Sequence, residues 1–223
     1  MENLDYNKLF ELQDRVLELV FTLNTDFYLT GGTCLNRFYL KKRYSDDLDF
    51  FTNFSNNFSY QVKEILSLLE EKSLKVEIKN DSRDFKRIVV KNKFSNLDIY
   101  FVNDRVKIFG DILINNKGYR LDNVKNILSN KITAIVSRDD PKDVFDLYVI
   151  SLNTDFSWKE ILSNAKQKMH FEKEYLVYRL RSFPKELFKQ IKLIDKNILN
   201  DFDKKFPILI ENIIEESDNK LKT

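Results

Sequence analysis

Glycine is scarce in this chain, and two of its four glycines stand side by side at Gly31 and Gly32. They follow a short apolar run and precede apolar residues at helical spacing, so we expect a junction between a strand and a helix. Because glycine has no Cβ, a pair at such a junction indicates that the backbone approaches another group closely. A helix beginning there directs free N–H groups toward an anion. The pair therefore predicts a phosphate-binding turn at Gly31, Gly32 and Thr33, although a Gly-Gly pair by itself is usually only a turn.

Two aspartates, Asp47 and Asp49, follow about fifteen residues later within a short apolar segment. Residues i and i+2 of a strand face the same way, so both carboxylates project together. Adjacent carboxylates are costly to bury unless a cation neutralises them, and oxygen ligands favour Mg²⁺ or Mn²⁺. Asp98 interrupts a second apolar strand and reaches the same place if the two strands are neighbours. The spacing predicts a metal site of three carboxylates; the alternative is a set of solvated strand-end aspartates.

Composition narrows the class of protein. The 43% hydrophobic content, with 19 Phe and 10 Tyr, predicts a folded globular core. No apolar run approaches the roughly 18 to 20 residues of a membrane helix, and no secretory signal is evident at the N-terminus, so we expect a cytoplasmic protein without membrane contact. With one cysteine and one histidine, a zinc cluster or a Ser-His or Cys-His catalytic pair is not expected.

The hydrophobic periodicity predicts an α/β (α+β) fold in two parts. Residues 1–122 form a domain with a mixed β-sheet, and residues 123–223 form a helical subdomain packed against it that completes a cleft. The helical part extends to about residue 216, with breaks near 140, 153 and 182–184. The expected elements of the first part are helix 4–23, strand 27–29, helix 33–40, strand 47–51, helix 58–71, strands 74–78, 85–90 and 94–102 in an antiparallel set, and weaker strands at 106–109 and 111–114.

The ordered motifs resemble the nucleotidyltransferase superfamily and, within it, the AbiEii/AbiGii toxin family of type IV toxin–antitoxin and abortive-infection systems. The resemblance covers residues 27–150. It rests on residues 31–35 (GGTCL), 43–51 (RYSDDLDFF), 97–99 (LDI), 131–134 (KITA) and 138–147 (RDDPKDVFDL). Lys142 departs from the pattern, because the family often has Arg before the aspartate that corresponds to Asp143. Lys lacks the planar guanidinium group that can donate two parallel hydrogen bonds.

The resemblance implies a metal-dependent nucleotidyltransferase fold with NTP as substrate and Mg²⁺ or Mn²⁺ as cofactor. The implied roles are metal binding by Asp47, Asp49 and, at a less regular position, Asp98; phosphate contacts by Gly32, Thr33 and Ser45; and completion of the active site by Lys131 and Asp143.

Several of these residues also fit plain structural roles. Asp140 is a candidate N-cap with Pro141 at the first helical position, and Asp143 then stabilises a helix start. Lys131 has apolar neighbours, so it either binds a triphosphate or extends its amine to solvent along an apolar surface. Asp146, one turn beyond Asp143, can pair with Arg138 or Lys142. Arg43 either contacts a phosphate or caps the entry to a strand.

The predicted reaction transfers a nucleoside monophosphate from an NTP to an acceptor hydroxyl and releases pyrophosphate. The resemblance implies a toxin whose acceptor is RNA, such as a tRNA 3′ end, or a protein, with a cognate antitoxin as a further partner. Ten basic against five acidic residues within 159–196 favour RNA weakly. Trp158, Phe171, Tyr175 and Tyr178 recur at helical spacing and are interpreted as core. Two alternatives stay open: a catalytically silent nucleotide-binding module and an enzyme that modifies a small molecule such as an antibiotic.

Overall fold

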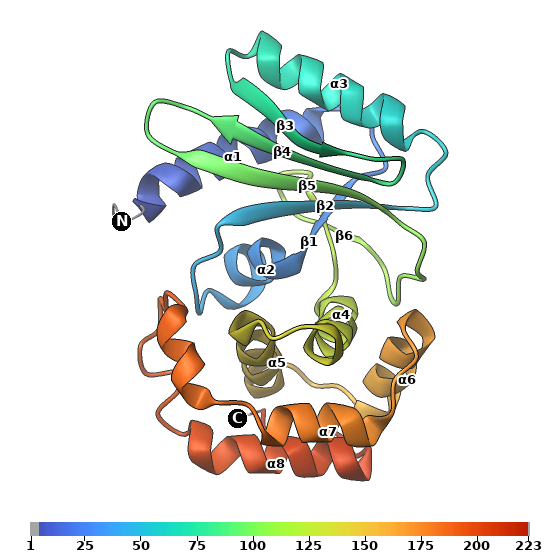
Figure 1. Cartoon of the computed structure of the whole chain (residues 1–223), viewed down its shortest axis with the longest axis vertical. Helices are drawn as coiled ribbons and strands as arrows, with labels where there is room; N and C mark the ends of the chain where they lie inside the picture. Colours follow the sequence, from blue (N-terminus) through green and yellow to red (C-terminus); the bar gives the residue numbers. More distant parts are fainter. Residues whose placement is uncertain (1–4, 223) are drawn as a thin grey trace. The chain divides into compact units, whose positions relative to one another are not determined.

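The computed structural model describes residues 5–222, which form two compact units. The sheet unit contains the chain up to Cys34 together with residues 45–106 and 111–122. The helical unit contains residues 35–44, 107–110 and the chain from Asn123 onward. Figure 1 follows the chain through both units, each of which is described by itself.

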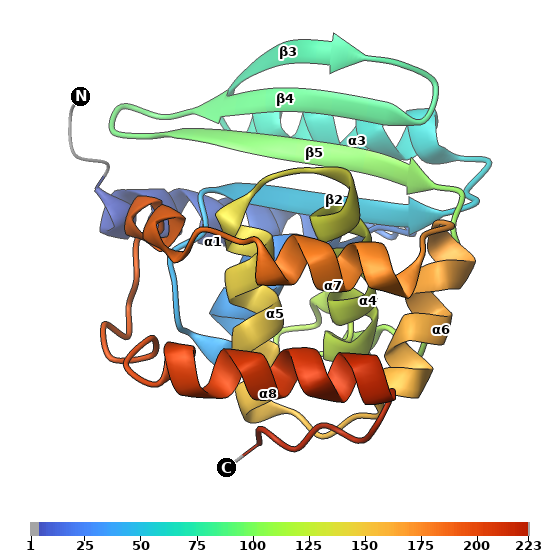
Figure 2. The ribbon, with the colours of Figure 1, turned by 60° about the horizontal axis from the view of Figure 1, so that its bottom comes forward.

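The sheet unit is built on one mixed seven-stranded sheet with the order β3-β4-β5-β2-β1-β7-β6. Two neighbouring pairs, β2 with β5 and β1 with β7, are parallel, and the other pairs are antiparallel. Figure 2 shows β3, β4 and β5 running side by side, as the sequence predicts for an antiparallel set. The strands are β1 (Tyr28–Thr30), β2 (Asp47–Asn53), β3 (Lys75–Asp81), β4 (Phe85–Lys91), β5 (Asn96–Asp104), β6 (Leu113–Ile114) and β7 (Arg120–Leu121).

Two helices cover one face of this sheet, α1 (Tyr6–Thr22) and α3 (Phe58–Glu71). The ring of Phe21 in α1 meets Phe50 of β2 edge-on with centroids 5.8 Å apart, and Phe58 of α3 meets Phe27 at the same distance. Burial of these aromatic side chains stabilises the face. Because side chains alternate along β2, the same pattern that buries Leu48 turns Asp47 and Asp49 to the other face.

Two local predictions differ from the structure. No strand forms over residues 106–109, because side chains at the start of the next helix bind that backbone: Asn126 Oδ1 accepts from the Phe109 N–H at 3.1 Å, and Asn123 Nδ2 donates to its carbonyl at 2.8 Å. The helix predicted from Thr33 begins at Gly31 as α2 (Gly31–Cys34), and the chain continues as the π-helix η1 (Leu35–Leu40).

The helical unit is organised around α4 (Val124–Ser137), which contacts α5 (Pro141–Asn153), α6 (Trp158–Lys168) and α7 (Lys173–Arg181). Figure 2 shows α7 beside α8 (Phe202–Glu215), and η2 (Lys185–Gln190) is a 3₁₀ turn that contacts α5. The predicted breaks near 140, 153 and 182–184 are confirmed. Within residues 5–222 no helix combines the length and apolar character needed to cross a bilayer.

Candidate functional site

The structure brings the three predicted metal carboxylates onto neighbouring strands. Asp47 in β2 and Asp98 in β5 are direct partners across the parallel ladder, and Asp49 is the partner of Tyr100. All three aspartates are half-buried and share one face of the sheet. The condition under which Asp98 reaches the same place as Asp47, that their two strands are neighbours, is therefore met.

The close approach predicted at the glycine pair is between Gly31 and a carboxylate of the chain itself. Gly31 has φ +69°, and a Cβ built on it would lie 2.1 Å from Asp49 Oδ2. That distance leaves no room for a methyl group, and positive φ is itself unfavourable for residues with a side chain. Gly31 thus lets the Asp49 carboxylate lie directly against the backbone where α2 begins. The phosphate contacts predicted for Gly31 and Gly32 remain a prediction.

Two hydroxyl groups predicted to contact phosphates hold the start of β2 in this structure. Thr33 Oγ1 donates to the Asp47 carbonyl at 2.5 Å, and Ser45 Oγ lies 3.5 Å from Asp47 Oδ1. Gln13 Nε2 in turn donates to the Ser45 carbonyl at 2.9 Å, in a buried contact that sequence reasoning missed. These bonds fix the backbone that presents the Asp47 carboxylate.

The donor set suits a hard divalent cation. Asp47 and Asp49 supply carboxylate oxygens, Ser45 supplies a hydroxyl beside them, and oxygen donors are what Mg²⁺ and Mn²⁺ prefer. Within the described part of the chain, no group of three or more carboxylate, His or Cys side chains is already gathered as a metal cage. Asp98 instead accepts a hydrogen bond from Arg87 Nε at 2.8 Å. The paired aspartates of β2 are therefore the better-supported ligands.

Lys131 in the helical unit is buried in a cluster of charges. Its Nζ lies 2.8 Å from Asp143 Oδ1 and 2.8 Å from Asp146 Oδ2. Burial alone would lower the pKa of Lys131, but the two carboxylates outweigh it and raise that pKa. The alternative in which Lys131 extends its amine to solvent is thus wrong, because only 10% of the side chain is exposed. Lys131 is held as a buried ammonium.

Asp146 is the centre of this cluster, and its partners are not those expected. Arg43 binds it with two parallel hydrogen bonds, Nε to Oδ1 and Nη2 to Oδ2, both 2.7 Å long. Burial favours the neutral acid, but the charges of Arg43 and Lys131 prevail and hold the pKa of Asp146 at about 2. The expected pairing of Asp146 with Arg138 or Lys142 is wrong. Its partner is Arg43, which lies 103 residues earlier in the sequence.

Asp143 lies at the start of α5 and also belongs to the charge cluster around Lys131, while its predicted part in an active site stays a prediction. Asp140 is the N-cap of α5, accepting from the Lys142 N–H at 2.9 Å, and Asp143 stands in the first turn behind Pro141. Its carboxylate also accepts from Lys131 and from Arg138 Nε at 2.8 Å. Burial opposes ionisation, yet these cations lower its pKa. The spacing of Asp143 and Asp146 on one helix face was the available signal that both belong to one cluster.

The predicted site residues thus form two groups, each within its own unit. Gly31, Gly32, Thr33, Ser45, Asp47, Asp49 and Asp98 belong to the sheet unit, and Arg43, Lys131 and Asp143 to the helical unit. The guanidinium of Arg43 binds Asp146 and also donates from Nη1 to the Tyr44 carbonyl at 2.9 Å, and its predicted role toward a nucleotide stays a prediction.

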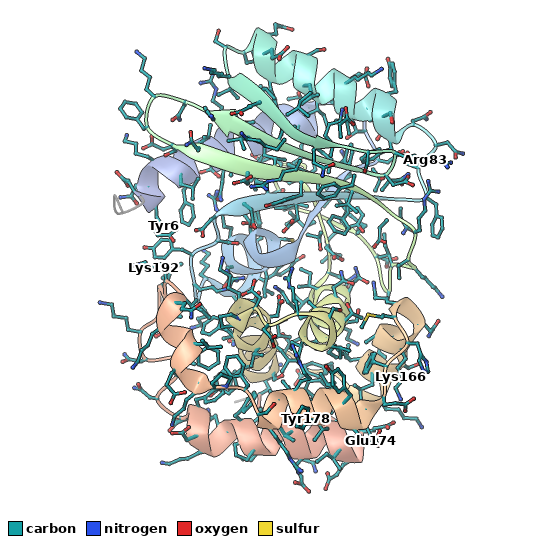
Figure 3. All side chains as sticks on the ribbon, viewed as in Figure 1. Tyr6, Arg83, Lys166, Glu174, Tyr178 and Lys192 are labelled. Atoms are coloured by element: carbon teal, nitrogen blue, oxygen red, sulfur yellow. The ribbon has the colours of Figure 1, made fainter. Side chains whose placement is uncertain are left out.

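Four aromatic residues interpreted as core separate into two kinds. Trp158 and Phe171 are buried, as expected. Tyr175 and Tyr178 are 45% and 64% exposed, so the core interpretation is wrong for them. Their rings stack with centroids 6.4 Å apart and planes inclined by 22°. Figure 3 labels Tyr178 and Glu174 on the same helix, α7. The spacing of three places both tyrosines on the solvent side of that helix.

Comparison with known proteins identifies a matching protein family and solved structures with a similar fold. Residues 17–216 match the family model described as the nucleotidyl transferase AbiEii toxin of type IV toxin–antitoxin systems. The structure of JHP933 from Helicobacter pylori is similar with a TM-score of 0.56 and 20% identity, covering 96% of this chain and 90% of that one. A second H. pylori structure, described as a candidate nucleotidyltransferase, has the same TM-score and identity and covers 95% and 91%. A search of curated proteins found no significant match.

Proposed function

This chain belongs to the AbiEii family of nucleotidyl transferase toxins of type IV toxin–antitoxin systems, and from that premise we propose that it transfers a nucleoside monophosphate from an NTP to a hydroxyl of RNA. In this reaction a bond forms between the acceptor oxygen and the α-phosphorus, and the bond from that phosphorus to the β-phosphate oxygen breaks. Pyrophosphate leaves with the displaced electron pair, and the acceptor hydroxyl loses its proton. A cognate antitoxin is part of the proposal.

The observation that carries the proposal is the pair Asp47 and Asp49, with Gly31 fitted against Asp49. Such a pair gains most from a bound divalent cation, because adjacent carboxylates repel one another when partly removed from water. A bound Mg²⁺ would supply positive charge for the triphosphate and lower the pKa of the attacking hydroxyl. Asp47 and Asp49 would hold it, while Ser45 and Thr33 fix the strand that presents them.

Two further residues have proposed roles in the transfer. Asp98, one strand away from Asp47, takes up the proton of the acceptor hydroxyl or adds a third metal ligand, and Arg87 orients its carboxylate. Lys131 binds the triphosphate through its ammonium, which Asp143 and Asp146 keep protonated. This arrangement also explains why a lysine with so little exposure retains its charge.

RNA is the favoured acceptor because of the tyrosine pair on α7. Exposed, mutually stacked aromatic rings are costly to leave in water and present flat faces on which bases can stack. Tyr175 and Tyr178 share their helix with Arg181, whose positive charge suits a phosphate backbone, whereas Lys173 and Arg179 are paired with Glu216 and Asp139.

The experiment is transfer of label from each of the four α-³²P NTPs, with Mg²⁺ or Mn²⁺, to total cellular RNA and to total protein. We expect labelled RNA from the wild-type chain and none from the Asp47→Asn, Asp49→Asn double variant. Asp203→Asn, an exposed carboxylate on α8, is the matched control and should keep full activity. Label in protein alone would overturn the RNA acceptor. NTP binding without transfer to either would favour a silent binding module.

A further inference from the structure

The proposed reaction gives the two sides of strand β2 different partners. In an in-line displacement, the attacking oxygen and the leaving pyrophosphate lie on opposite sides of the α-phosphorus. The turn at Gly31 and Gly32, where the sequence predicts phosphate contacts, ends β1 on one side of β2, and β5 and β4 lie on the other side. Figure 2 shows β2, β5 and β4 in succession. With the leaving phosphates at the glycine turn, the acceptor approaches over β5 and β4.

Two side chains follow Asp98 on the acceptor side of the sheet. Asp98 of β5 is the partner of Asp47 in β2. Tyr100, two residues later on the same face, is the partner of Asp49 in β2 and of Arg87 in β4. Residues i and i+2 of a strand are roughly 7 Å apart, which is comparable with the distance between a ribose hydroxyl and the base of the same nucleotide. An acceptor hydroxyl at Asp98 therefore brings its own base to Tyr100 and Arg87.

Tyr100 and Arg87 form a stacked pair. The Arg87 guanidinium lies over the Tyr100 ring, 5.7 Å from its centroid, and the ring of Phe85 packs against Tyr100 with centroids 6.3 Å apart. Tyr100 is half-buried, and 43% of the Arg87 side chain is exposed. Aromatic rings and guanidinium planes are the surfaces on which unpaired RNA bases stack. The pair therefore offers a nucleobase a flat contact that solvent can reach.

Arg87 also has donors left for a phosphate. Its Nε donates to Asp98 Oδ1 at 2.8 Å, and within residues 5–222 its two terminal nitrogens make no hydrogen bond. The four N–H groups of those nitrogens are thus available. A guanidinium can bind phosphate oxygens through two parallel hydrogen bonds. One arginine can therefore orient the Asp98 carboxylate and at the same time bind the phosphate of the nucleotide whose hydroxyl lies beside Asp98.

We propose that Arg87 and Tyr100 bind the last nucleotide of the acceptor RNA, with its base stacked on the pair and its 5′ phosphate at the terminal nitrogens of Arg87. The proposal rests on the proposed function and names the part of the substrate that β4 and β5 recognise. Asp98 then lies beside the hydroxyl of the same nucleotide. Stacking and phosphate contacts read no base edge, so the site positions the end of a strand without selecting its sequence.

The test is a set of double-mutant cycles between the full chain and a 5′-labelled single-stranded RNA, measured by fluorescence anisotropy with Mg²⁺ and without NTP. The first cycle uses this RNA intact and with its 3′-terminal base removed. Tyr100→Leu keeps most of the side-chain volume but loses the ring, and it should weaken binding of the intact RNA about tenfold. Removal of the 3′ base should weaken binding to the wild type by a similar factor and binding to Tyr100→Leu no further. Tyr100→Phe should bind like the wild type.

The second cycle pairs Arg87→Ala with an RNA whose last linkage is an uncharged methylphosphonate. Each change alone should weaken binding about fivefold, and the two together no more than either one. Arg105 is the matched control, because it pairs with Asp84 at 2.7 Å, is 46% exposed and lies 5.9 Å from the ring centroid of Phe54. Arg105→Ala should bind all three RNAs like the wild type, and so should Tyr60→Ala, the control for the tyrosine.

Transfer supplies a readout that a merely structural role would not change. Arg87→Ala and Tyr100→Leu should each raise the KM for RNA about tenfold and leave the KM for NTP unchanged. Additive losses in both cycles, wild-type affinity of both variants, or unchanged affinity of the wild type for both modified RNAs would each overturn the proposal. Absence of label transfer by the wild-type chain would instead overturn the proposed function, and the binding cycles, which contain no NTP, would still decide whether Arg87 and Tyr100 hold the end of an RNA.

Discussion

The Asp49 carboxylate lies directly against the α-carbon of Gly31, where a β-carbon would come within 2.1 Å of Oδ2. This contact joins the glycine turn to the strand that carries both candidate metal ligands. The absence of a side chain at Gly31 therefore makes room for a carboxylate of the same unit. The glycine pair and the aspartate pair are one structural feature, although Gly31 and Asp47 lie sixteen positions apart in the sequence.

Gly31→Ala should destabilise the chain more than Gly118→Ala. Both glycines have positive φ, +69° and +80°, so each substitution incurs backbone strain of about 1 kcal/mol. A Cβ at Gly118 meets nothing within 4 Å, whereas at Gly31 it displaces Asp49. We expect Gly31→Ala to lower the free energy of unfolding by about 2 kcal/mol or more, measured by urea unfolding. Equal losses of unfolding free energy in the two variants would show that the contact between Gly31 and Asp49 does not contribute to stability.

Asp146→Asn should be among the most destabilising single substitutions in the helical unit. It leaves the buried Arg43 guanidinium and the Lys131 ammonium without their shared counter-charge, which costs about 3–5 kcal/mol. Asp203→Asn breaks only an exposed pair with Lys185 and serves as the control, with no measurable change expected. Denaturant unfolding of both variants is the measurement. Similar unfolding free energies of Asp146→Asn and Asp203→Asn would contradict a stabilising role of Asp146 between Arg43 and Lys131.

The same carboxylate predicts how stability depends on pH. The folded pKa of Asp146 is about 2, below the ordinary value of 3.8, so the unfolded chain binds more protons between these values. Its contribution, about 2 kcal/mol, is fully present above about pH 5 and is lost as the pH falls through 2. Urea unfolding at a series of pH values should show this loss in the wild type and a smaller one in Asp146→Asn. An identical acid dependence would exclude Asp146 as its source.

The tyrosine pair makes a prediction about RNA. Replacing both Tyr175 and Tyr178 with Ala should weaken binding of single-stranded RNA about tenfold or more, because two stacking faces are lost. Tyr60→Ala, at a tyrosine 64% exposed on α3, provides the control and should leave binding unchanged. Fluorescence anisotropy with a labelled oligonucleotide measures the effect. Unchanged affinity of the double variant would remove the main support for an RNA acceptor.

Sequence reasoning succeeded where the signal was local. Alternation along residues 47–51 correctly placed Asp47 and Asp49 on one face, and Asp140 with Pro141 correctly marked the start of α5. The pairing of β2 with β5 entered the sequence argument only as a condition, and the structure meets that condition.

Long-range pairing is where sequence reasoning failed. Nothing near Arg43 in the sequence indicates that its partner is Asp146, because that contact depends on tertiary packing within the helical unit. Tyr175 and Tyr178 have the spacing of core residues, and only the side of α7 that faces solvent shows otherwise. The strand expected over 106–109 failed for a similar reason, because side chains from α4 bind the Phe109 backbone.

The most direct test of the central claim is label transfer with single substitutions of the β2 carboxylates. Asp47→Asn and Asp49→Asn should each lower the rate of transfer from labelled NTP to RNA by at least about a hundredfold, since each removes a proposed ligand of the catalytic cation. Asp203→Asn should match the wild type, and the circular dichroism spectra of all three variants should be unchanged. Transfer that persists at the wild-type rate in both Asp47→Asn and Asp49→Asn would contradict the assignment of these residues as the catalytic pair.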